Sequence, residues 1–88
     1  MEITFDSAKD EINIAKHGIS LANAALIEWD AALTWPDVRK NYGEDRMAGI
    51  GYIAQRLYYV VFVDRDEVRR IISLRKANDR EVKRYAET

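Results

Sequence analysis

The chain has 88 residues, of which 48% are hydrophobic and 33% are charged, and its formal net charge is −1. This length and composition predict a single globular domain, residues 1–88, with a small core, and they exclude a disordered chain. With no cysteine and one histidine, the sequence excludes disulfides and thiolate metal sites, so we expect neither a metal nor a cofactor.

Charge is distributed unevenly along the chain. The first 44 residues contain four Lys or Arg and eight acidic residues, whereas the last 44 contain ten and seven. A cationic C-terminal half suits a polyanion such as nucleic acid, and it equally suits an acidic protein partner. No apolar run approaches the ~20 residues that span a bilayer, and the N-terminus lacks a signal-peptide pattern, so we expect a cytoplasmic protein without membrane contact.

The first part of the sequence predicts a short strand and a helix. Residues Glu2–Phe5 are mostly β-formers. Asp6 or Ser7 is the expected N-cap of the helix, and Ser7 resembles a capping box with Asp10. The helix is expected to end at His17, with the glycine after it in the left-handed conformation. Four apolar residues lie on one face of this helix: Ala8, Ile12, Ala15 and Ile19.

A second helix is expected to begin with Ser20 as its N-cap, after a very short connection. Its expected apolar stripe consists of Ala22, Ala25, Leu26 and Trp29. Residues Ala31–Thr34 form either a short strand or an irregular run, and Pro36 excludes a central strand at that point. The polar stretch Asp37–Asp45 predicts a loop.

From Arg46 onward the hydrophobic pattern has a period of two and predicts three strands: Met47–Ile53, Leu57–Asp64 and Val68–Arg75. Tight turns at Ala54-Gln55 and Arg65-Asp66 make consecutive strands antiparallel. Asn78 is the expected N-cap of a last helix and forms a capping box with Glu81. The sequence therefore predicts a small α+β domain, β-α-α-(loop)-β-β-β-α, in which helices pack on an antiparallel sheet meander.

The strand and exit Val68–Ala77 carry the strongest candidate site. Because side chains alternate along a strand, it has two faces. One face carries Val68, Arg70, Ile72 and Leu74, and the other carries Arg69, Ile71, Ser73 and Arg75. Ser73, Arg75 and Lys76 offer a hydroxyl and two cations for binding phosphate, and the alternative is a buried strand with a charged edge. His17, at a helix end, is either a partner of the helix dipole or a catalyst.

Several motifs along the chain resemble the BrnT family. The first consists of Phe5-Asp6-x-Ala8-Lys9, then Asn13 and Lys16-His17-Gly18-Ile19-Ser20. The rest consists of Gly43-Glu44-x-Arg46 with Gly51, and Arg70-Ile71-Ile72-Ser73-x-Arg75-x-Ala77 with Glu81 and Tyr85. Two helix-start positions depart from the family, which commonly has Pro where this chain has Ser7 and Glu where it has Asn23. Nothing between Trp29 and Asn41 matches.

The resemblance implies the toxin of a bacterial type II toxin–antitoxin pair, with a RelE-like fold, that cleaves RNA without a metal and arrests growth. It implies a BrnA-like antitoxin, a small ribbon-helix-helix protein that binds operator DNA, so that the two proteins form a hetero-oligomer that represses its own promoter. A metal-free nuclease uses the RNA 2′-hydroxyl as its nucleophile, so DNA is not expected to be cut.

This chemistry assigns candidate roles to the motif residues. Arg75 would clamp the phosphate with its planar fork, and Ser73 would donate a hydrogen bond to a non-bridging oxygen. His17 or Lys16 would transfer protons, with Glu44 as a lesser candidate for the base. Further cations would supplement the positive field: Arg46, and Arg70 or Lys76. The expected antitoxin-binding residues lie in the last helix: Arg80, Lys83, Arg84 and Tyr85.

Two other functions stay open from the sequence. One is a non-catalytic binding module whose basic C-terminal half docks an acidic partner. The other is a direct DNA binder, which ranks lower because the chain lacks a recognisable helix-turn-helix and its first half is acidic.

Overall fold

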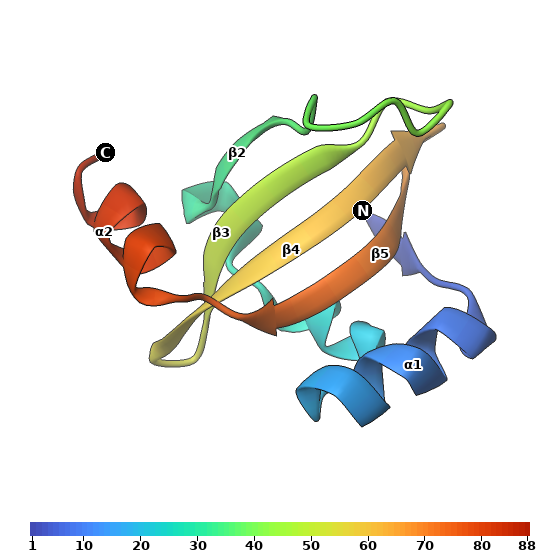
Figure 1. Cartoon of the computed structure of the whole chain (residues 1–88), viewed down its shortest axis with the longest axis horizontal. Helices are drawn as coiled ribbons and strands as arrows, with labels where there is room; N and C mark the ends of the chain where they lie inside the picture. Colours follow the sequence, from blue (N-terminus) through green and yellow to red (C-terminus); the bar gives the residue numbers. More distant parts are fainter.

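The computed structural model describes residues 1–88 and contains one five-stranded sheet in the order β1-β5-β4-β3-β2 (Figure 1). The strands are β1 (Glu2–Thr4), β2 (Leu33–Pro36), β3 (Met47–Ile53), β4 (Arg56–Arg65) and β5 (Val68–Lys76). The helices are α1 (Ser7–His17), α2 (Asp79–Ala86) and two short 3-10 helices, η1 (Leu21–Leu26) and η2 (Trp29–Ala31). The predicted α+β class is confirmed. No helix is both long and apolar enough to cross a bilayer.

The sheet is mixed, so the prediction of a purely antiparallel sheet is wrong. Strands β2 to β5 pair antiparallel, but β1 runs parallel to β5, with Glu2 opposite Val68 and Thr4 opposite Arg70. A three-residue strand holds too little pattern to indicate its partner or direction. β2 is an edge strand that ends at Pro36, a residue with no N–H to donate to a neighbour.

The two hairpin turns of the meander differ in how well the sequence indicates them. The turn between β3 and β4 lies at Ala54-Gln55, as predicted. The turn between β4 and β5 lies at Asp66-Glu67, so the prediction of Arg65-Asp66 is wrong by one residue. Asp66 and Glu67 have φ values of 52° and 69°, the left-handed backbone that matches a tight turn to the twist of its strands.

The segment predicted as a second α-helix forms the two 3-10 helices instead. Ser20 is the N-cap of η1, as predicted, and its hydroxyl accepts the backbone N–H of Ala22. The buried residues are spaced by three: Leu21, Ala24 and Ile27. Most of the predicted stripe is exposed: Ala22, Ala25 and Leu26. A period of three is that of a 3-10 helix, which is why a stripe drawn at the α-helical period is wrong.

α1 packs through polar side chains and not through its predicted apolar face. Ile12, on that face, is 65% exposed. Asn13 is buried, and its amide nitrogen donates to the carbonyls of Leu74 at 2.8 Å and Ile19 at 2.9 Å. Its amide oxygen accepts the Leu74 N–H at 3.2 Å. Asn13 thus pairs with the outer edge of β5 as a neighbouring strand would, and this holds α1 beside the strand.

The caps of α1 are partly as predicted. Asp6 is the N-cap, and Gly18 follows the helix with φ 73°. The predicted capping box between Ser7 and Asp10 is wrong, because the Asp10 carboxylate accepts the backbone N–H of Leu21 at 2.7 Å. Asp10 therefore connects α1 to η1 across the short link between them.

A β-bulge changes the faces of β5. The register between β4 and β5 shifts by one residue and leaves Ile72 without a partner on β4. The extra residue puts Ile71 and Leu74 together in the hydrophobic cluster beneath η1. The prediction that Ile71 shares a face with Ser73 and Arg75 is therefore wrong, although Ser73 and Arg75 do remain together.

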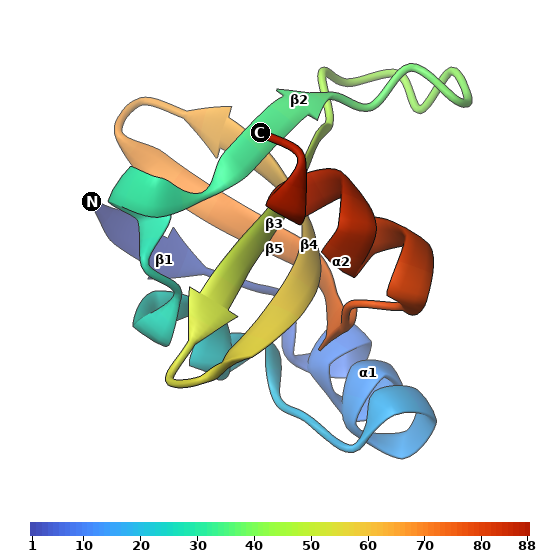
Figure 2. The same cartoon turned by 90° about the vertical axis from the view of Figure 1, so that its left-hand side faces the viewer.

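Hydrophobic clusters lie on both faces of the sheet. The first packs beneath η1 and consists of Leu21, Ala24, Ile27, Val60, Phe62, Ile71 and Leu74. The second consists of Ala48, Ile50, Leu57, Tyr59 and Val61. Figure 2 shows α2 in front of the sheet beside β3 and β4, with α1 below. The predicted capping box of Asn78 and Glu81 is confirmed, and Tyr85 attaches α2 by donating to the carbonyl of Ala31 at 2.9 Å.

Candidate active site

Three of the predicted site residues, Lys16, His17 and Ser73, lie around one shallow cavity where α1 ends beside β5. The contact between Asn13 and Leu74 holds the helix against the strand edge, so the end of α1 meets the bulged part of β5. The cavity is completed by Lys9, Ile12, Asn13 and Ile72. A helix terminus and a strand bulge therefore bring an imidazole, an ammonium group and a hydroxyl to one place.

His17 lies in an environment that disfavours its charged form. Burial has the largest effect, and the positive charges of Lys16 and Arg75 add to it, so the pKa of His17 is below its usual value of 6.5. The imidazole is therefore neutral at pH 7 and able to accept a proton. Arg75 does not line the cavity, but it follows Ser73 by two residues on the same face of β5.

Arg75 lies on the face of the sheet that carries the second hydrophobic cluster, where an aromatic ring and a carboxylate hold it. Its guanidinium carbon lies 4.4 Å from the ring centre of Tyr59, its register partner on β4. Nη1 and Nη2 donate to the two carboxylate oxygens of Glu81, each at 2.8 Å, and Nη1 also donates to the carbonyl of Lys76 at 3.2 Å. The side chain is 31% exposed. Arg75 is thus fixed in orientation but accessible from solvent.

The contacts of Arg75 leave one edge of its fork open. A guanidinium has five N–H donors, and Glu81 and Lys76 use three of them. The Nε–H and the second N–H of Nη2 lie on the same side of the group and make no hydrogen bond in the structure. A phosphate can accept both of these donors at once.

Glu81 joins Arg75 to the start of α2. Burial alone would raise the pKa of Glu81, but hydrogen bonds from Arg75 and from the backbone N–H of Asn78, with the positive charges of Arg75 and Arg39, hold that pKa below its usual value. The same hydrogen bond to Glu81 raises the pKa of Arg75. The ion pair is therefore complete at neutral pH, and Glu81 caps α2 and orients Arg75 with one carboxylate.

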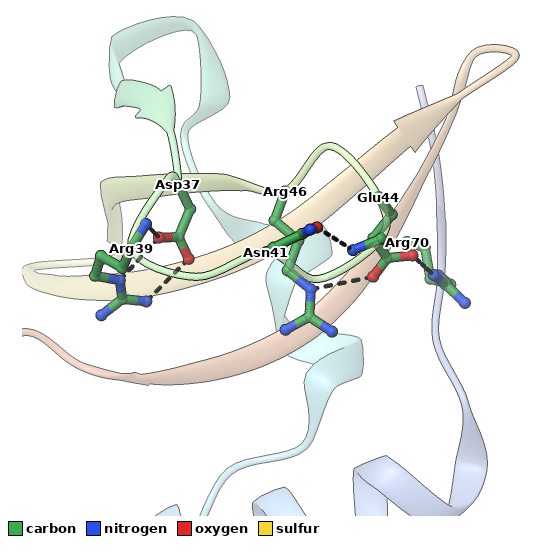
Figure 3. A network of polar contacts seen from close by, with 7 residues as sticks. Asp37, Arg39, Asn41, Glu44, Arg46 and Arg70 are labelled. Carbon is green, nitrogen blue, oxygen red and sulfur yellow. Dashed lines mark hydrogen bonds and ion pairs between the residues drawn. The ribbon is translucent and has the colours of Figure 1, made fainter.

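Three more predicted residues, Glu44, Arg46 and Arg70, form a separate ion-paired group (Figure 3). Glu44 accepts from Arg46 Nε at 3.0 Å and from Arg70 Nη2 at 2.8 Å. The hydrogen bond from Arg46 is the largest influence that holds the pKa of Glu44 below its usual value. None of the three lines the His17 cavity, and a carboxylate shared by two arginines is a weak proton acceptor.

The structure places the predicted antitoxin-binding residues of α2 in two kinds of surroundings. Arg80 and Lys83 are exposed and form no ion pair. Arg84 lies over the ring of Trp35, with 3.7 Å from its guanidinium carbon to the ring centre. Tyr85 packs edge-on against Tyr52 at 5.5 Å, so its ring belongs to the second hydrophobic cluster. Lys76 is exposed at the end of β5.

Sequence reasoning misses Tyr59, which contacts Arg75, and the ion pair of Asp37 with Arg39. Tyr59 is hidden in a continuously apolar strand, where an aromatic residue is the default core residue. An aspartate two residues before an arginine in a polar loop is a weak signal, because the burial of Asp37 cannot be read from the loop's composition.

Taken together, the fold and the site define a small α+β domain that gathers cations, a hydroxyl and a neutral imidazole where a phosphate ester could bind. No three His, Cys, Asp or Glu side chains lie close enough together to hold a metal ion.

The sequence profile described as "Ribonuclease toxin, BrnT, of type II toxin-antitoxin system" matches residues 5–81. The chain therefore belongs to the BrnT family, whose members are ribonuclease toxins of type II toxin–antitoxin systems. The matched segment includes the cavity at His17 and Ser73 and the Arg75–Glu81 ion pair. No curated protein matches the sequence.

Proposed function

We propose that this chain is a metal-independent endoribonuclease toxin with a RelE-like fold that arrests growth until an antitoxin neutralises it. One observation carries this proposal: neutral His17, Lys16 and Ser73 share a cavity, and Arg75 presents an open fork edge near it. These side chains cover the tasks of RNA cleavage, which are proton transfer, phosphate binding and stabilisation of the developing charge.

In the proposed reaction the RNA 2′-oxygen attacks the adjacent phosphorus, and the bond from phosphorus to the 5′-oxygen breaks. His17, which is neutral, takes the proton from the 2′-hydroxyl. Lys16 donates a proton to the departing 5′-oxygen. The products are a 2′,3′-cyclic phosphate and a 5′-hydroxyl, and DNA is not a substrate because it has no 2′-hydroxyl.

Charge stabilisation in this scheme comes from Arg75 and Ser73. The open edge of Arg75 donates to two phosphate oxygens, and Glu81 fixes the guanidinium before substrate binds. The Ser73 hydroxyl donates to a non-bridging oxygen. Arg46, Arg70 and Lys76 contribute to the positive field, and Glu44 neutralises part of it and leaves the role of base to His17.

The proposed partner is a BrnA-like ribbon-helix-helix antitoxin, through which the hetero-oligomer binds operator DNA. Its neutralising segment is acidic or amphipathic and packs near the end of β5 and against α2. Arg80 and Lys83 suit rim contacts, because they are exposed and free of ion pairs. Tyr85 can act as an anchor only through its exposed part, since its ring packs against Tyr52.

Expression without an antitoxin tests the proposal in cells. The intact chain is expected to arrest bacterial growth, and Arg75→Ala is expected to relieve the arrest at equal protein level. Arg56→Ala, which removes an exposed arginine at the start of β4, is the matched control and should remain toxic. Normal growth with intact, soluble protein would instead favour a non-catalytic module that docks an acidic partner.

A further inference from the structure

The loop between β2 and β3, here called the Asp37–Arg46 loop, contains an arginine that a buried carboxylate holds in place (Figure 3). Arg39 Nε donates to Asp37 Oδ1 at 2.8 Å, and Arg39 Nη2 donates to Asp37 Oδ2 at 2.9 Å. The Asp37 side chain is 2% exposed and the Arg39 side chain is 65% exposed. The backbone N–H of Asp37 donates to the carbonyl of Arg46 at 2.8 Å and closes the base of the loop.

This pair is arranged differently from an ordinary surface ion pair. An ordinary surface ion pair has both partners in solvent and contributes little to stability. Here the carboxylate is buried, which has a desolvation cost that its hydrogen bonds to Arg39 must offset. Asp37 binds Nε and Nη2 of Arg39, so the edge formed by Nη1 and the second N–H of Nη2 makes no hydrogen bond and faces away from the carboxylate. Hydrogen bonding to Arg39 holds the pKa of Asp37 below its usual value, which keeps the pair ionised at neutral pH. The result is a fixed guanidinium with an open bidentate edge.

Asp37 holds Arg39 on the face of the sheet that carries Arg75. The N–H bond of Asp37 to Arg46 continues the pairing of β2 with β3, so Asp37 lies on the same face as Trp35, two residues before it. The Trp35 ring, two residues before Asp37, is 6.2 Å from the Tyr59 ring, and the Arg75 guanidinium covers Tyr59. Burial raises the pKa of the Tyr59 hydroxyl, whereas the charges of Arg39 and Arg75 both act to lower it. The rings of Trp35 and Tyr59 thus connect the start of the loop to Arg75, and the two guanidinium groups are held at opposite edges of this face.

We propose that Arg39 binds a second phosphate of the RNA, next to the one bound at Arg75, and that Asp37 is the residue that positions it. The substrate strand then crosses the sheet over Tyr59, from the end of β5 to the Asp37–Arg46 loop. The ligand class is a single-stranded polynucleotide backbone, because two fixed guanidinium forks on one face match successive phosphates. This inference rests on the proposed ribonuclease function and adds a binding subsite outside the cleavage chemistry.

The ion pair of Arg69 with Asp64 differs from that of Arg39 with Asp37 in which partner is enclosed. Arg69 Nε and Nη2 bind the two Asp64 oxygens at 2.7 and 2.8 Å, in the same geometry as the pair of Arg39 and Asp37. In that pair the arginine is the enclosed partner, with a side chain 18% exposed and stacked on Trp29. In the loop the carboxylate is enclosed and the arginine faces solvent, as a ligand-binding role requires.

Binding of a short, mixed-sequence 2′-O-methyl RNA separates this inference from cleavage, because that RNA lacks the attacking hydroxyl. Arg39→Gln is expected to weaken binding about tenfold and to lower the slope of log affinity against log salt by about 0.7, the contribution of one phosphate contact in a single strand. Arg56→Gln removes one exposed charge elsewhere and is expected to leave both values nearly unchanged. With cleavable RNA, Arg39→Gln should raise KM and leave kcat close to that of the parent protein.

Two further variants keep the test decisive. Arg39→Lys keeps the charge without the fork and should recover only part of the affinity, and Asp37→Asn should weaken binding with Arg39 still present. Equal affinities for Arg39→Gln and Arg56→Gln, in proteins with the parent circular dichroism spectrum, would overturn the inference while leaving the nuclease proposal intact. Arg39-dependent binding by a protein that never cleaves RNA would support the subsite and reject the nuclease.

Discussion

Arg69 and Arg75 are both ion-paired and stacked on aromatic rings, but they lie on opposite faces of β5. Arg69 lies 4.1 Å from the Phe62 ring centre and 4.4 Å from that of Trp29, on the face covered by the 3-10 helices. Arg75 lies over Tyr59, on the face that α2 partly covers. The Arg69 side chain is 18% exposed, whereas the Arg75 side chain is 31% exposed and keeps two N–H donors without a hydrogen-bond partner.

The cover on each face explains this difference. The 3-10 helices contribute buried side chains, including Leu21 and Ala24, to the cluster beneath them. α2 contributes no buried residue and attaches mainly through Glu81, Arg84 and Tyr85. The same residue type therefore serves packing on one face and, in our proposal, substrate binding on the other.

The largest expected effect is the loss of RNA cleavage when Arg75, and not Arg69, is replaced. Arg75→Ala should lower RNA cleavage at least ~10²-fold, the scale of losing one charge-stabilising donor, with the fold retained. Arg75→Lys should also be poor, because an ammonium cannot reproduce the fork. Initial rates on a fluorescent RNA substrate give this value.

Arg69→Ala is the matched variant for the other face. It should reduce the free energy of unfolding by about 1–2 kcal/mol, through lost stacking on Trp29 and Phe62, and leave cleavage by the folded protein nearly unchanged. Thermal unfolding by circular dichroism measures the first effect. Equal losses of cleavage in Arg69→Ala and Arg75→Ala would contradict the proposal that Arg75 binds substrate and Arg69 only packs.

A pH profile of RNA cleavage tests the proposed role of His17 as the proton acceptor. The pKa of His17 is below 6.5, so its neutral, proton-accepting form predominates above that pH. Cleavage should stay level above pH 6.5 and fall as the pH drops through the lowered pKa. His17→Gln should cost about 10²-fold, at the low end for general acid–base catalysis, and should remove this inflection. An unchanged acid limb in His17→Gln would assign the titration to another group.

A smaller effect is expected from the carboxylate that orients Arg75. Glu81→Gln keeps an oxygen for the cap of α2 but loses the charged bidentate contact with Arg75. We expect kcat to fall about tenfold because the guanidinium is less well positioned, while KM stays level or falls because the site gains positive charge. A rise in kcat would show that Glu81 competes with the substrate for Arg75.

The smallest effect expected concerns the rim of α2. Reversing Arg80, Lys83 and Arg84 to Glu should slow association with the antitoxin and reduce its salt dependence, since rim charges act mainly on the association rate. RNA cleavage by the free toxin should change less than it does in Arg75→Ala. Unaltered association kinetics at low salt would exclude α2 from the docking surface.

Local signals in the sequence are enough to predict most of the elements and their ends. The caps at Asp6, Ser20 and Asn78 and the left-handed Gly18 depend on neighbouring residues only, and the structure has them where the sequence indicates them. The three meander strands also follow from pattern and short turns.

Features that depend on distant residues could not be predicted from these patterns. Asn13 is a polar residue in a helix until the edge of β5 is known, and only then does its amide become a bridge to Leu74. The bulge at Ile72 results from how β5 pairs with β4, and it moves Ile71 to the other face. The Asp37–Arg39 pair is equally hidden, because its significance comes from burial of the carboxylate.

The most direct test of the proposed mechanism is RNA cleavage by the purified, partner-free protein in EDTA, with a DNA strand of the same sequence in parallel. We expect RNA to be degraded to products with 2′,3′-cyclic phosphate ends and DNA to stay intact. Activity that disappears on chelation and returns with magnesium would contradict the proposal that His17, Ser73 and Arg75 perform the chemistry themselves.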